Sequence, residues 1–426
     1  MSIKRQLPNP KQLRELLQFK KPELNAVKRR LDQALTVEDL RKIAKRRTPK
    51  APFDYTDGSA EGEISYQRAK QAFQDIEFHP EVLKPTPNID TSVEILGGPS
   101  ALPFGTAPTG FARMMQTEGE IAGAGAAGAA GIPFTLSTLG TVSIEEVKAV
   151  NPQGRNWFQL YLMKDREISY GLVERAAAAG FDTLFFTVDT PIPGNRMRDT
   201  RNGFSIPPQL SVKTILDALP RPEWWMNFLT TPQLEFASLA NTGGTVADLI
   251  GAAFDPTISE ADLDIIRQMW PGKIVVKGIQ TLKDAQRMVD AGVDGIVLSN
   301  HGGRQLDRAP VPFHLLPDVA RELGNDTTII LDTGVTNGAD VVAAHALGAD
   351  FVLVGRAWLY GLMAGGRAGV DKMIEIMTAE IRRTMGLLGA ASIDELNPDH
   401  VTQLARLVPR NTSIRVQETH SSNSQY

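Results

Sequence analysis

The chain has 426 residues, of which 42% are hydrophobic and 22% are charged, as is typical of a globular protein with a sizeable core. It contains no cysteine, which excludes disulfide bonds, thiolate metal sites and cysteine nucleophiles, and we predict no metal centre. No stretch reaches the roughly 18 apolar residues of a membrane span, and residues 1–20 lack the apolar core of a secretory signal, so we expect neither element.

The formal net charge of −4 is unevenly distributed along the chain. Residues 1–50 hold 15 Lys and Arg against 5 Asp and Glu, whereas the remainder is acidic. A basic segment of this kind either packs as a solvated surface or attracts an anionic partner such as a membrane surface. It lacks the combined aromatic and basic platform of nucleic-acid-binding domains, so we predict no nucleic-acid partner. We expect residues 1–100 to form a largely helical N-terminal extension.

From about residue 100 onward, short apolar runs alternate with helical patterns. The eight runs occupy residues 102–110, 132–138, 156–162, 183–190, 273–279, 295–301, 328–334 and 351–356. Their apolarity is continuous, which is typical of strands buried on both faces of a parallel sheet. Eight strand-then-helix units predict an α/β fold, a (β/α)8 TIM barrel over residues 101–395, with a doubly wound sheet as the alternative.

Within the second unit, residues 123–128, GAGAAG, match the glycine spacing of a dinucleotide-binding loop. That loop requires a preceding strand, whereas the preceding residues TEGEIA have a helical pattern and the predicted strand follows. We therefore interpret Gly123, Gly125 and Gly128 as the small face of a helix that packs against the barrel, and we predict no NAD site.

A long insertion after the fourth strand, residues 191–258, contains many Pro, Gly and Asn residues and a Trp-rich patch. Connections of this length are usually lids or binding segments. The stretch 221–229, RPEWWMNFL, places five large apolar side chains within six positions, which indicates a lid folded onto the barrel mouth. Residues 396–426 form a C-terminal segment whose polar tail we expect to be disordered.

Polar side chains occur at the end of every predicted strand. They include Thr109, Ser137, Gln159, Tyr161, Thr187, Asp189, Lys277, Ser299, His301, Asp332 and Arg356. In a TIM barrel the C-terminal ends of the strands converge on the face that carries the active site. We therefore expect these side chains to form one site.

The stretch SNHGGRQLD, residues 299–307, places a candidate base beside a candidate carboxylate-binding group. His301 has the chemistry of a general base at neutral pH. The glycines after it allow the backbone to approach a ligand closely, and Arg304 offers a bidentate fork for a carboxylate. Asp189 either hydrogen-bonds His301 and holds its tautomer or forms an ordinary salt bridge.

Lys277 ends the run VVKG, and three roles fit it: a Schiff base, a phosphate contact or the stabilisation of an anion. The loops after strands seven and eight are the usual phosphate site of TIM barrels. Gly334, Gly355 and Arg356 in these loops therefore predict a phosphate-bearing ligand. Asp332 is expected to accept hydrogen bonds from hydroxyl groups of the same ligand.

SNHGGRQLD resembles the signature of the FMN-dependent α-hydroxy acid dehydrogenases. The resemblance extends over roughly residues 35–395 and includes, in order, FDYTDGSAEGE, APTGF, FTLSTL, WFQLY, TVDTPIPGNRMRD, VVKGIQT and LVGRAWLYG. Within the family the chain resembles most the quinone-linked L-lactate dehydrogenases of bacteria. The resemblance implies FMN as cofactor, an L-2-hydroxy acid such as L-lactate as substrate, and membrane quinone as electron acceptor.

The resemblance also implies roles for individual residues around the substrate. His301 would be the active-site base and Asp189 its partner. Arg304 and Arg196 would hold the substrate carboxylate with help from Tyr55. The substrate hydroxyl would receive a hydrogen bond from Tyr161.

For the cofactor, the resemblance implies one contact set for each part of FMN. Lys277 would stabilise the negative charge of the reduced ring. Asp332 would bind the ribityl chain. The phosphate would be bound by Gly334, Gly355 and Arg356. The isoalloxazine would be held by Pro108, Thr109, Gly110, Ser137, Gln159, Thr187 and Ser299.

Three positions depart from the family's pattern. Thr336 stands where many relatives have a phosphate-binding arginine, so phosphate binding depends more on Arg356. Leu139 stands where glycolate oxidase has tryptophan, which makes glycolate a poorer substrate. Gly110 replaces an alanine of several oxidases and leaves the electron acceptor open.

Three alternative functions remain at this point. An O2-using oxidase or monooxygenase has the same site, a Schiff-base aldolase would use Lys277 without flavin, and a flavin-binding protein could be catalytically inactive. The family is commonly tetrameric, so we expect a homo-oligomer. Its quinone-linked members carry a membrane-contacting segment in the insertion, so the resemblance implies that RPEWWMNFL, residues 221–229, contacts the membrane, with the lid as the alternative. We therefore expect a peripheral enzyme on the cytoplasmic side of the cell membrane, with a soluble cytoplasmic enzyme as the alternative.

Overall fold

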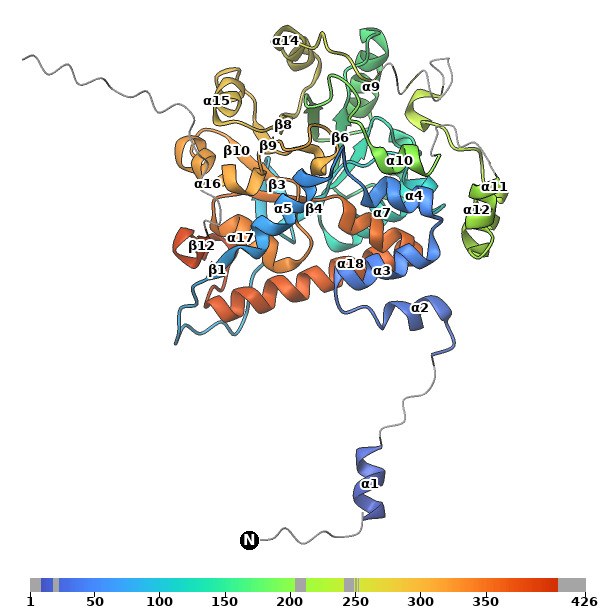
Figure 1. Ribbon diagram of the computed structural model, residues 1–426. Helices are drawn as coiled ribbons and strands as arrows, with labels where there is room; N and C mark the ends of the chain where they lie inside the picture. The colour runs from blue at the N-terminus through green and yellow to red at the C-terminus, as the bar shows by residue number, and fades with distance from the viewer. Residues whose placement is uncertain are drawn as a thin grey trace, which may run out of the picture.

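The computed structural model describes residues 9–17, 23–203, 212–240, 249, 251 and 253–404. Eight parallel strands close into a barrel in the order β10-β11-β4-β5-β6-β7-β8-β9 (Figure 1). The strands are β4 (Phe104–Thr106), β5 (Phe134–Ser137), β6 (Asn156–Leu160), β7 (Thr183–Thr187), β8 (Lys273–Ile279), β9 (Gly295–Leu298), β10 (Thr328–Leu331) and β11 (Phe351–Val354). Each lies within one of the predicted apolar runs, and the predicted TIM barrel is confirmed.

A ring of helices surrounds the barrel. After the strands come α7 (Gly119–Ala130), α8 (Ile144–Val150), α9 (Arg166–Ala178), α14 (Glu260–Met269), α15 (Leu282–Asp290), α16 (Pro312–Leu323), α17 (Gly338–Ala346) and α18 (Arg356–Leu388). Side-chain caps start several of them; the Ser143, Thr281 and Asn337 side chains each accept a hydrogen bond from a backbone N–H of the first turn. These caps follow loops of a few residues, so each helix packs back on its own strand.

The barrel interior is filled by large apolar side chains. Trp157 and Phe185 stack with ring centroids 5.2 Å apart, and Phe351 meets Trp157 edge-on. A hairpin of β2 (Val93–Ile95) and β3 (Gly98–Ser100) packs Ile95 and Leu96 into the same cluster. The interior is therefore a packed core, and only the C-terminal face of the barrel is available for a ligand.

Helix α7 contains the glycines that match a dinucleotide-binding loop. A Cβ at Gly123 would lie 2.7 Å from the Phe134 ring, and a Cβ at Gly128 would lie 2.1 Å from the Asn151 side chain. The helix therefore approaches the barrel too closely for larger residues. The interpretation as a packing face is confirmed.

The N-terminal extension begins with helices and ends with strands. Helices α1 (Pro10–Leu16), α2 (Ala26–Leu31), α3 (Val37–Arg47), α4 (Lys50–Asp57) and α5 (Ile64–Gln74) precede β1 (Ile76–Phe78) and the hairpin. Figure 1 shows α3 lying along α18. Strand β1 pairs antiparallel with β12 (Val401–Gln403), which places the end of the N-terminal extension beside residues 401–403. The polar tail predicted beyond this strand lies outside the described residues.

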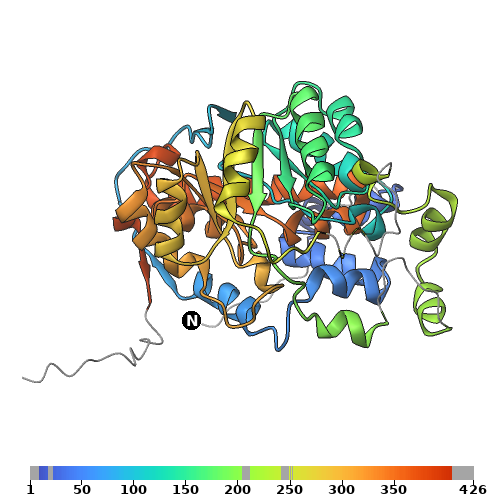
Figure 2. The ribbon, with the colours of Figure 1, turned by 90° about the horizontal axis from the view of Figure 1, so that it is seen from above.

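The insertion after β7 contains α10 (Met197–Arg201), α11 (Val212–Ala218), α12 (Pro222–Thr230) and a short 3-10 turn, Ala237–Leu239. Figure 2 shows α11 and α12 at one side of the molecule, away from the barrel axis. The indole N–H of Trp224 donates to the Met114 carbonyl at 2.9 Å, and Trp224 stacks on Phe228. Among the described residues, no helix combines the length and apolarity needed to cross a membrane.

Candidate active site

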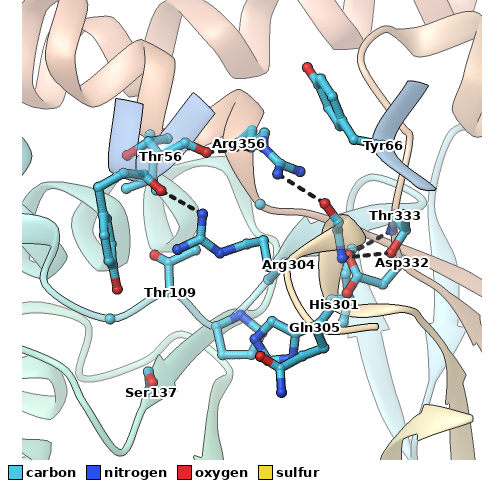
Figure 3. Close-up of a pocket in the computed structure, with 18 of the residues that line it drawn as sticks. Thr56, Tyr66, Thr109, Ser137, His301, Arg304, Gln305, Asp332, Thr333 and Arg356 are labelled. Atoms are coloured by element: carbon cyan, nitrogen blue, oxygen red, sulfur yellow. Dashed lines mark hydrogen bonds between the residues drawn. The ribbon is translucent and has the colours of Figure 1, made fainter. Parts of the chain in front are cut away.

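One cavity opens at the C-terminal face of the barrel (Figure 3). Its lining includes 14 residues that the sequence analysis identified: Tyr55, Pro108, Thr109, Gly110, Ser137, Tyr161, Arg196, Lys277, His301, Arg304, Asp332, Gly334, Gly355 and Arg356. The others lie buried behind this lining: Gln159, Thr187, Asp189 and Ser299. The strand ends therefore meet at one site, as predicted.

His301 is held between a carboxylate and a phenol. Its Nδ1 lies 3.1 Å from Asp189 Oδ1, and its Nε2 lies 3.4 Å from the Tyr161 hydroxyl. Because a carboxylate only accepts hydrogen bonds, the neutral ring carries its proton on Nδ1 and presents the Nε2 lone pair to the cavity. The predicted pairing of His301 with Asp189 is present.

Tyr161 lies at the same end of the cavity as His301. Burial raises the pKa of the Tyr161 phenol, and the Asp189 and Tyr55 side chains act in the same direction. Tyr161 therefore keeps its proton and can donate a hydrogen bond to a bound oxygen.

Two guanidinium groups share one aromatic ring. The Cζ of Arg304 lies 4.8 Å and that of Arg196 5.0 Å from the centroid of Tyr55. Arg196 forms an ion pair with Asp199 at 2.8 Å, whereas Arg304 has no carboxylate within 4 Å in the described chain and donates to backbone carbonyls, including that of Gly58. Burial and then the like charge of Arg196 lower the pKa of Arg304 to about 10, which leaves it charged at neutral pH. This part of the cavity suits an anion.

Lys277 is buried in a hydrogen-bonded triangle. Its Nζ lies 2.9 Å from Asp332 Oδ2 and donates to Ser299 Oγ at 3.1 Å, and that hydroxyl donates to Asp332 at 2.8 Å. Burial alone would lower the pKa of Lys277, but the charges of Asp332 and Asp189 outweigh it and raise the pKa. The amine is therefore cationic, which favours anion stabilisation over the nucleophilic amine that a Schiff base needs.

Several buried polar atoms at the floor of the cavity have no partner within the described part of the protein. They include Thr109 Oγ1, Gln159 Nε2 and Thr187 Oγ1. Gln159 Oε1 accepts from Ser137 Oγ at 2.8 Å, which leaves its amide N–H groups free to donate. Such unsatisfied groups are costly unless a ligand completes them. Their positions coincide with those predicted for the isoalloxazine, so the residues present fit a polar, planar ring.

The loops after β10 and β11 form the other end of the cavity. Gly334 has a φ of +93°, and a Cβ there would meet the Ala69 carbonyl at 2.9 Å. Arg356 donates to the carbonyls of Thr56 and Gly302 and lies with its Cζ 4.5 Å from the Tyr66 ring centroid. The predicted phosphate contacts therefore lie at one end of the cavity, and the protein backbone fixes the Arg356 side chain there.

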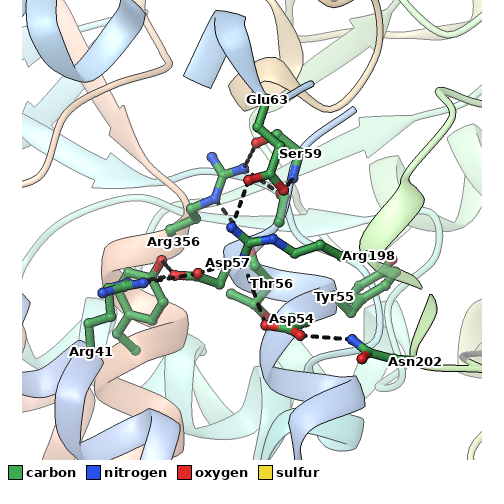
Figure 4. Close-up of polar contacts among 12 residues, drawn as sticks. Arg41, Asp54, Tyr55, Thr56, Asp57, Ser59, Glu63, Arg198, Asn202 and Arg356 are labelled. Carbon is green, nitrogen blue, oxygen red and sulfur yellow. Dashed lines mark hydrogen bonds and ion pairs between the residues drawn. The ribbon is translucent and has the colours of Figure 1, made fainter. Parts of the chain in front are cut away.

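Asp57 connects the N-terminal extension to the site (Figure 4). Its buried carboxylate accepts two hydrogen bonds from Arg41, one from Arg198 at 2.9 Å and one from the Tyr360 hydroxyl at 2.8 Å. Burial alone would raise the pKa of Asp57, but these partners, Arg41 first, lower it to about 2. The network fastens α4, which carries Tyr55, to α3, α10 and α18.

Sequence reasoning missed several residues that line the cavity. They are Thr56, Tyr66, Phe254, Gln305 and Thr333, among others. Thr56 and Tyr66 lie on helices of the extension, where no strand end marks them. Thr333 has a φ of +85°, which is unusual for a β-branched residue, and its hydroxyl accepts from the Gly302 N–H at 3.1 Å. Gln305 follows Arg304 directly in SNHGGRQLD, so that motif contained a signal for it.

Comparison with known proteins agrees with this geometry. The pattern of the family described as FMN-dependent dehydrogenase matches residues 44–403. The chain is 60% identical over 409 residues to a putative L-lactate dehydrogenase of Mycobacterium tuberculosis, covering 96% of this chain and 99% of that protein. It is 41% identical over 368 residues to the L-lactate dehydrogenase of Ectopseudomonas mendocina, covering 85% and 97%.

Two solved structures are also similar. The monotopic membrane protein (S)-mandelate dehydrogenase superposes with a TM-score of 0.83 at 37% identity, covering 87% of this chain and 100% of that one. A soluble mutant of the membrane-associated (S)-mandelate dehydrogenase from Pseudomonas putida gives a TM-score of 0.75 at 36% identity, with the same coverage.

Proposed function

The chain belongs to the FMN-dependent dehydrogenase family, and we propose that it oxidises an L-2-hydroxy acid, L-lactate to pyruvate, and passes the electrons to membrane quinone. One observation carries the proposal: a histidine held by a carboxylate and two guanidinium groups line the same cavity. A 2-hydroxy acid has the matching groups, a carboxylate next to a hydroxyl-bearing carbon.

Each side chain of the site has a separate role around such a substrate. Arg304 and Arg196 bind the carboxylate, and this orients the substrate hydroxyl toward His301 and Tyr161. His301 Nε2 accepts a proton, and the Asp189 carboxylate stabilises the imidazolium that results. Lys277 places a positive charge where negative charge develops. FMN, when bound, supplies the acceptor for the two electrons that leave the substrate.

Leu139 and Gly110 both line the cavity. A Cβ at Gly110 would lie 3.0 Å from the Leu139 carbonyl, so the two residues are in close contact. The names of the sequence relatives favour L-lactate, whereas the structural neighbours are named for mandelate, which carries a larger substituent. L-Lactate, L-mandelate and glycolate are therefore the substrates to compare.

Attachment to the membrane surface is the second part of the proposal. On α11, α12 and the turn between them, the exposed large apolar side chains are Val212, Ile215, Leu216, Leu219, Met226 and Leu229, which we call the α11–α12 apolar face. Burying such side chains at a lipid surface gives reversible attachment without a span. The likeness to an enzyme named as a monotopic membrane protein supports this proposal.

Within RPEWWMNFL, the large apolar side chains differ in their exposure. Trp224, Trp225 and Phe228 are half-buried, and Trp224 is hydrogen-bonded to Met114, so these aromatic side chains dock α12 on the protein. No residue of 221–229 lines the cavity in the described part of the chain. Contact with lipid would come from the α11–α12 apolar face instead.

The basic N-terminal segment also has internal roles. Arg41 pairs with Asp57, Arg47 pairs with Glu223 on α12, and Arg30 donates to the Ala364 carbonyl. These arginines are therefore part of the packing of the extension. The other basic residues of the segment remain candidates for attraction to anionic lipid.

One experiment tests the proposed reaction. The purified protein is loaded with FMN and mixed anaerobically with L-lactate, D-lactate, L-mandelate and glycolate, and the flavin absorbance is followed. We expect L-lactate to bleach the flavin and D-lactate to leave it unchanged. Addition of a quinone analogue should then restore the absorbance, and little peroxide should form in air. If no 2-hydroxy acid bleaches the flavin, the proposed function is wrong; rapid peroxide formation would identify an oxidase instead.

A further inference from the structure

Two loops at the mouth of the cavity carry two functional pairs of residues, and each loop supplies one residue of each pair. The loop after β7 holds Asp189 and Arg196, and the loop after β9 holds His301 and Arg304. Asp189 pairs with His301, and Arg196 shares the Tyr55 ring with Arg304. Both pairs keep their geometry only if the two loops keep a fixed relative position.

The side-chain amide of Gln305 joins these two loops by three hydrogen bonds. Its Oε1 accepts from the Gly194 N–H at 3.0 Å, and its Nε2 donates to the carbonyls of Asp189 at 3.2 Å and Ile192 at 2.9 Å. Figure 3 shows Gln305 beside His301. Its acceptor and both donors are thus directed at the loop after β7, and one of them binds the backbone of Asp189 itself.

The backbones of the two loops are in direct contact next to this amide. A Cβ at Gly194 would lie 2.1 Å from the Arg304 carbonyl oxygen and 2.9 Å from Gln305 Cα. Any side chain at position 194 would push the loops apart. A second attachment holds the loop after β7 from the other side, because the Glu61 N–H donates to the Asn195 carbonyl at 2.8 Å. Loss of Gln305 should therefore shift the loop without unfolding it.

We propose that Gln305 is a positioning residue of the hydroxy acid site. It holds Asp189 against His301, which sets the proton-accepting nitrogen, and it holds Arg196 opposite Arg304, which sets the carboxylate site. It acts through these residues and not by contact with the reacting atoms. The inference rests on the proposed function, because both pairs matter only if a 2-hydroxy acid binds between them.

The test replaces the amide with a side chain of similar length that makes no hydrogen bonds, Gln305→Met. Substrate reduction of FMN is measured by anaerobic stopped flow, and FMN affinity and the melting temperature are measured separately. We expect the rate constant for flavin reduction to fall about 10- to 100-fold, which is the usual cost of a small misplacement. The Kd for oxalate, an unreactive carboxylate ligand, should rise, while FMN affinity and melting temperature stay near those of wild type. The matched control is Gln403→Met, since Gln403 lies on the distant strand β12 and donates to the Phe313 carbonyl on α16.

A double-mutant cycle shows whether Gln305 acts through Asp189. In an Asp189→Asn background, Gln305→Met should lower the reduction rate by a much smaller factor than it does in wild type. If Gln305→Met fails to fold, Gly194→Ala takes its place, because it separates the same loops from the opposite side. The same fall in the rate of flavin reduction and the same rise in the Kd for oxalate are then expected.

The failures of the two proposals are distinguishable. If wild type is bleached by L-lactate but Gln305→Met is equally fast, only the positioning role is wrong. The positioning role would also be overturned if Gln305→Met lowered the reduction rate by the same factor in wild type and in the Asp189→Asn background. Weaker FMN binding and a lower melting temperature with an unchanged Kd for oxalate would overturn it as well. If wild type itself is not bleached by any 2-hydroxy acid, the proposed function fails instead.

Discussion

Lys277 Nζ lies 2.9 Å from Asp332 Oδ2 in the interior of the site, and Ser299 Oγ contacts both side chains. The ammonium compensates a carboxylate that is also out of contact with water, so each charge depends on the other. The same ammonium borders the cavity, where it supplies positive charge to a ligand. One side chain therefore has a structural and an electrostatic task, and substitutions separate the two.

Lys277→Met should destabilise the fold and disable the site. Removal of one partner from a buried pair costs about 3–5 kcal/mol, because the other charge is left uncompensated. We expect a lower melting temperature and a lower flavin reduction potential. The double variant Lys277→Met/Asp332→Asn should recover much of the melting temperature but not the potential. Recovery of both properties together would show that Lys277 has only the structural task.

His301→Gln should bind FMN normally and react slowly. Glutamine keeps the size of the side chain but cannot accept a proton, so flavin reduction by L-lactate should slow by on the order of 10²–10⁴-fold. Anaerobic stopped flow measures the rate, and the flavin spectrum measures FMN content. The control is His314→Gln, because His314 is exposed on α16. Near-normal bleaching of the His301 variant would remove this residue from the mechanism.

Arg304→Lys should weaken substrate binding more than it slows the chemical step. Lysine keeps the charge but loses the planar fork, and the loss of a charged hydrogen bond corresponds to about 10- to 100-fold in Kd. Titration of the flavin spectrum with oxalate measures this change. Arg308→Lys, at an exposed position four residues away, should be silent. Unchanged oxalate affinity in the Arg304 variant would place the substrate carboxylate elsewhere.

Stability should decrease as the pH falls from about 6.5 to 4, in part through His345. Its Nε2 faces the Pro103 carbonyl at 2.9 Å, and burial lowers the pKa of His345 to about 4 even though that hydrogen bond opposes the shift. Across this window the unfolded chain binds a proton that the folded chain does not. The contribution of His345 to the free energy of unfolding is complete above pH 6.5 and is lost by pH 4. This loss is at most about 3 kcal/mol.

His345→Gln isolates this contribution from other groups. Its amide can still donate to the Pro103 carbonyl but does not titrate. The difference in melting temperature between wild type and variant should therefore change between pH 7 and pH 4, with wild type losing more. A constant difference across that range would show that His345 does not contribute to the acid sensitivity. The comparison is needed because Asp340, whose pKa burial raises to about 6, acts in the opposite direction.

Polar substitutions on the α11–α12 apolar face should release the protein from membranes. Replacing Leu216, Leu219, Met226 and Leu229 with Gln removes side chains that contribute about 1.5–3 kcal/mol each when buried. Turnover with a soluble dye should persist, whereas quinone reduction in membranes should fall. Leu387→Gln, at an exposed apolar position on α18, is the control. If the fourfold variant still sediments with membranes, this face does not attach the protein.

Much of the barrel is predictable because burial on both faces leaves a simple signature. Strands such as 295–298 and 328–331 consist almost wholly of apolar residues, and the polar residue that follows each one, Ser299 or Asp332, marks the C-terminal face. The convergence of His301, Lys277 and Asp332 then follows from barrel geometry alone. The distances between these side chains do not follow from barrel geometry, because the distances depend on loop conformation.

The contacts that the N-terminal extension makes around the site are not predictable from the pattern of apolar runs. Asp57 is bound by Arg198 and Tyr360, which lie far from it in the chain, and by Arg41 on another helix 16 residues before it. Ion pairs between distant segments leave no periodic signal. The orientation of α12 is different, because Trp224 and Phe228 are four residues apart and therefore share one face of a helix. That spacing could have indicated that the aromatic side chains point inward.

The pairing of β1 with β12 has a consequence for the order in which the protein is assembled. During synthesis β1 emerges early, yet in the described structure its strand partner is β12, which is made more than 300 residues later. Contacts so distant in sequence close late, after the intervening barrel has formed. The strand that follows the segment with Tyr55 and Asp57 is thus paired only after residues 401–403 have been made. A nascent chain that stops before β12 would have the barrel and the Asp57 network, but β1 would lack its strand partner.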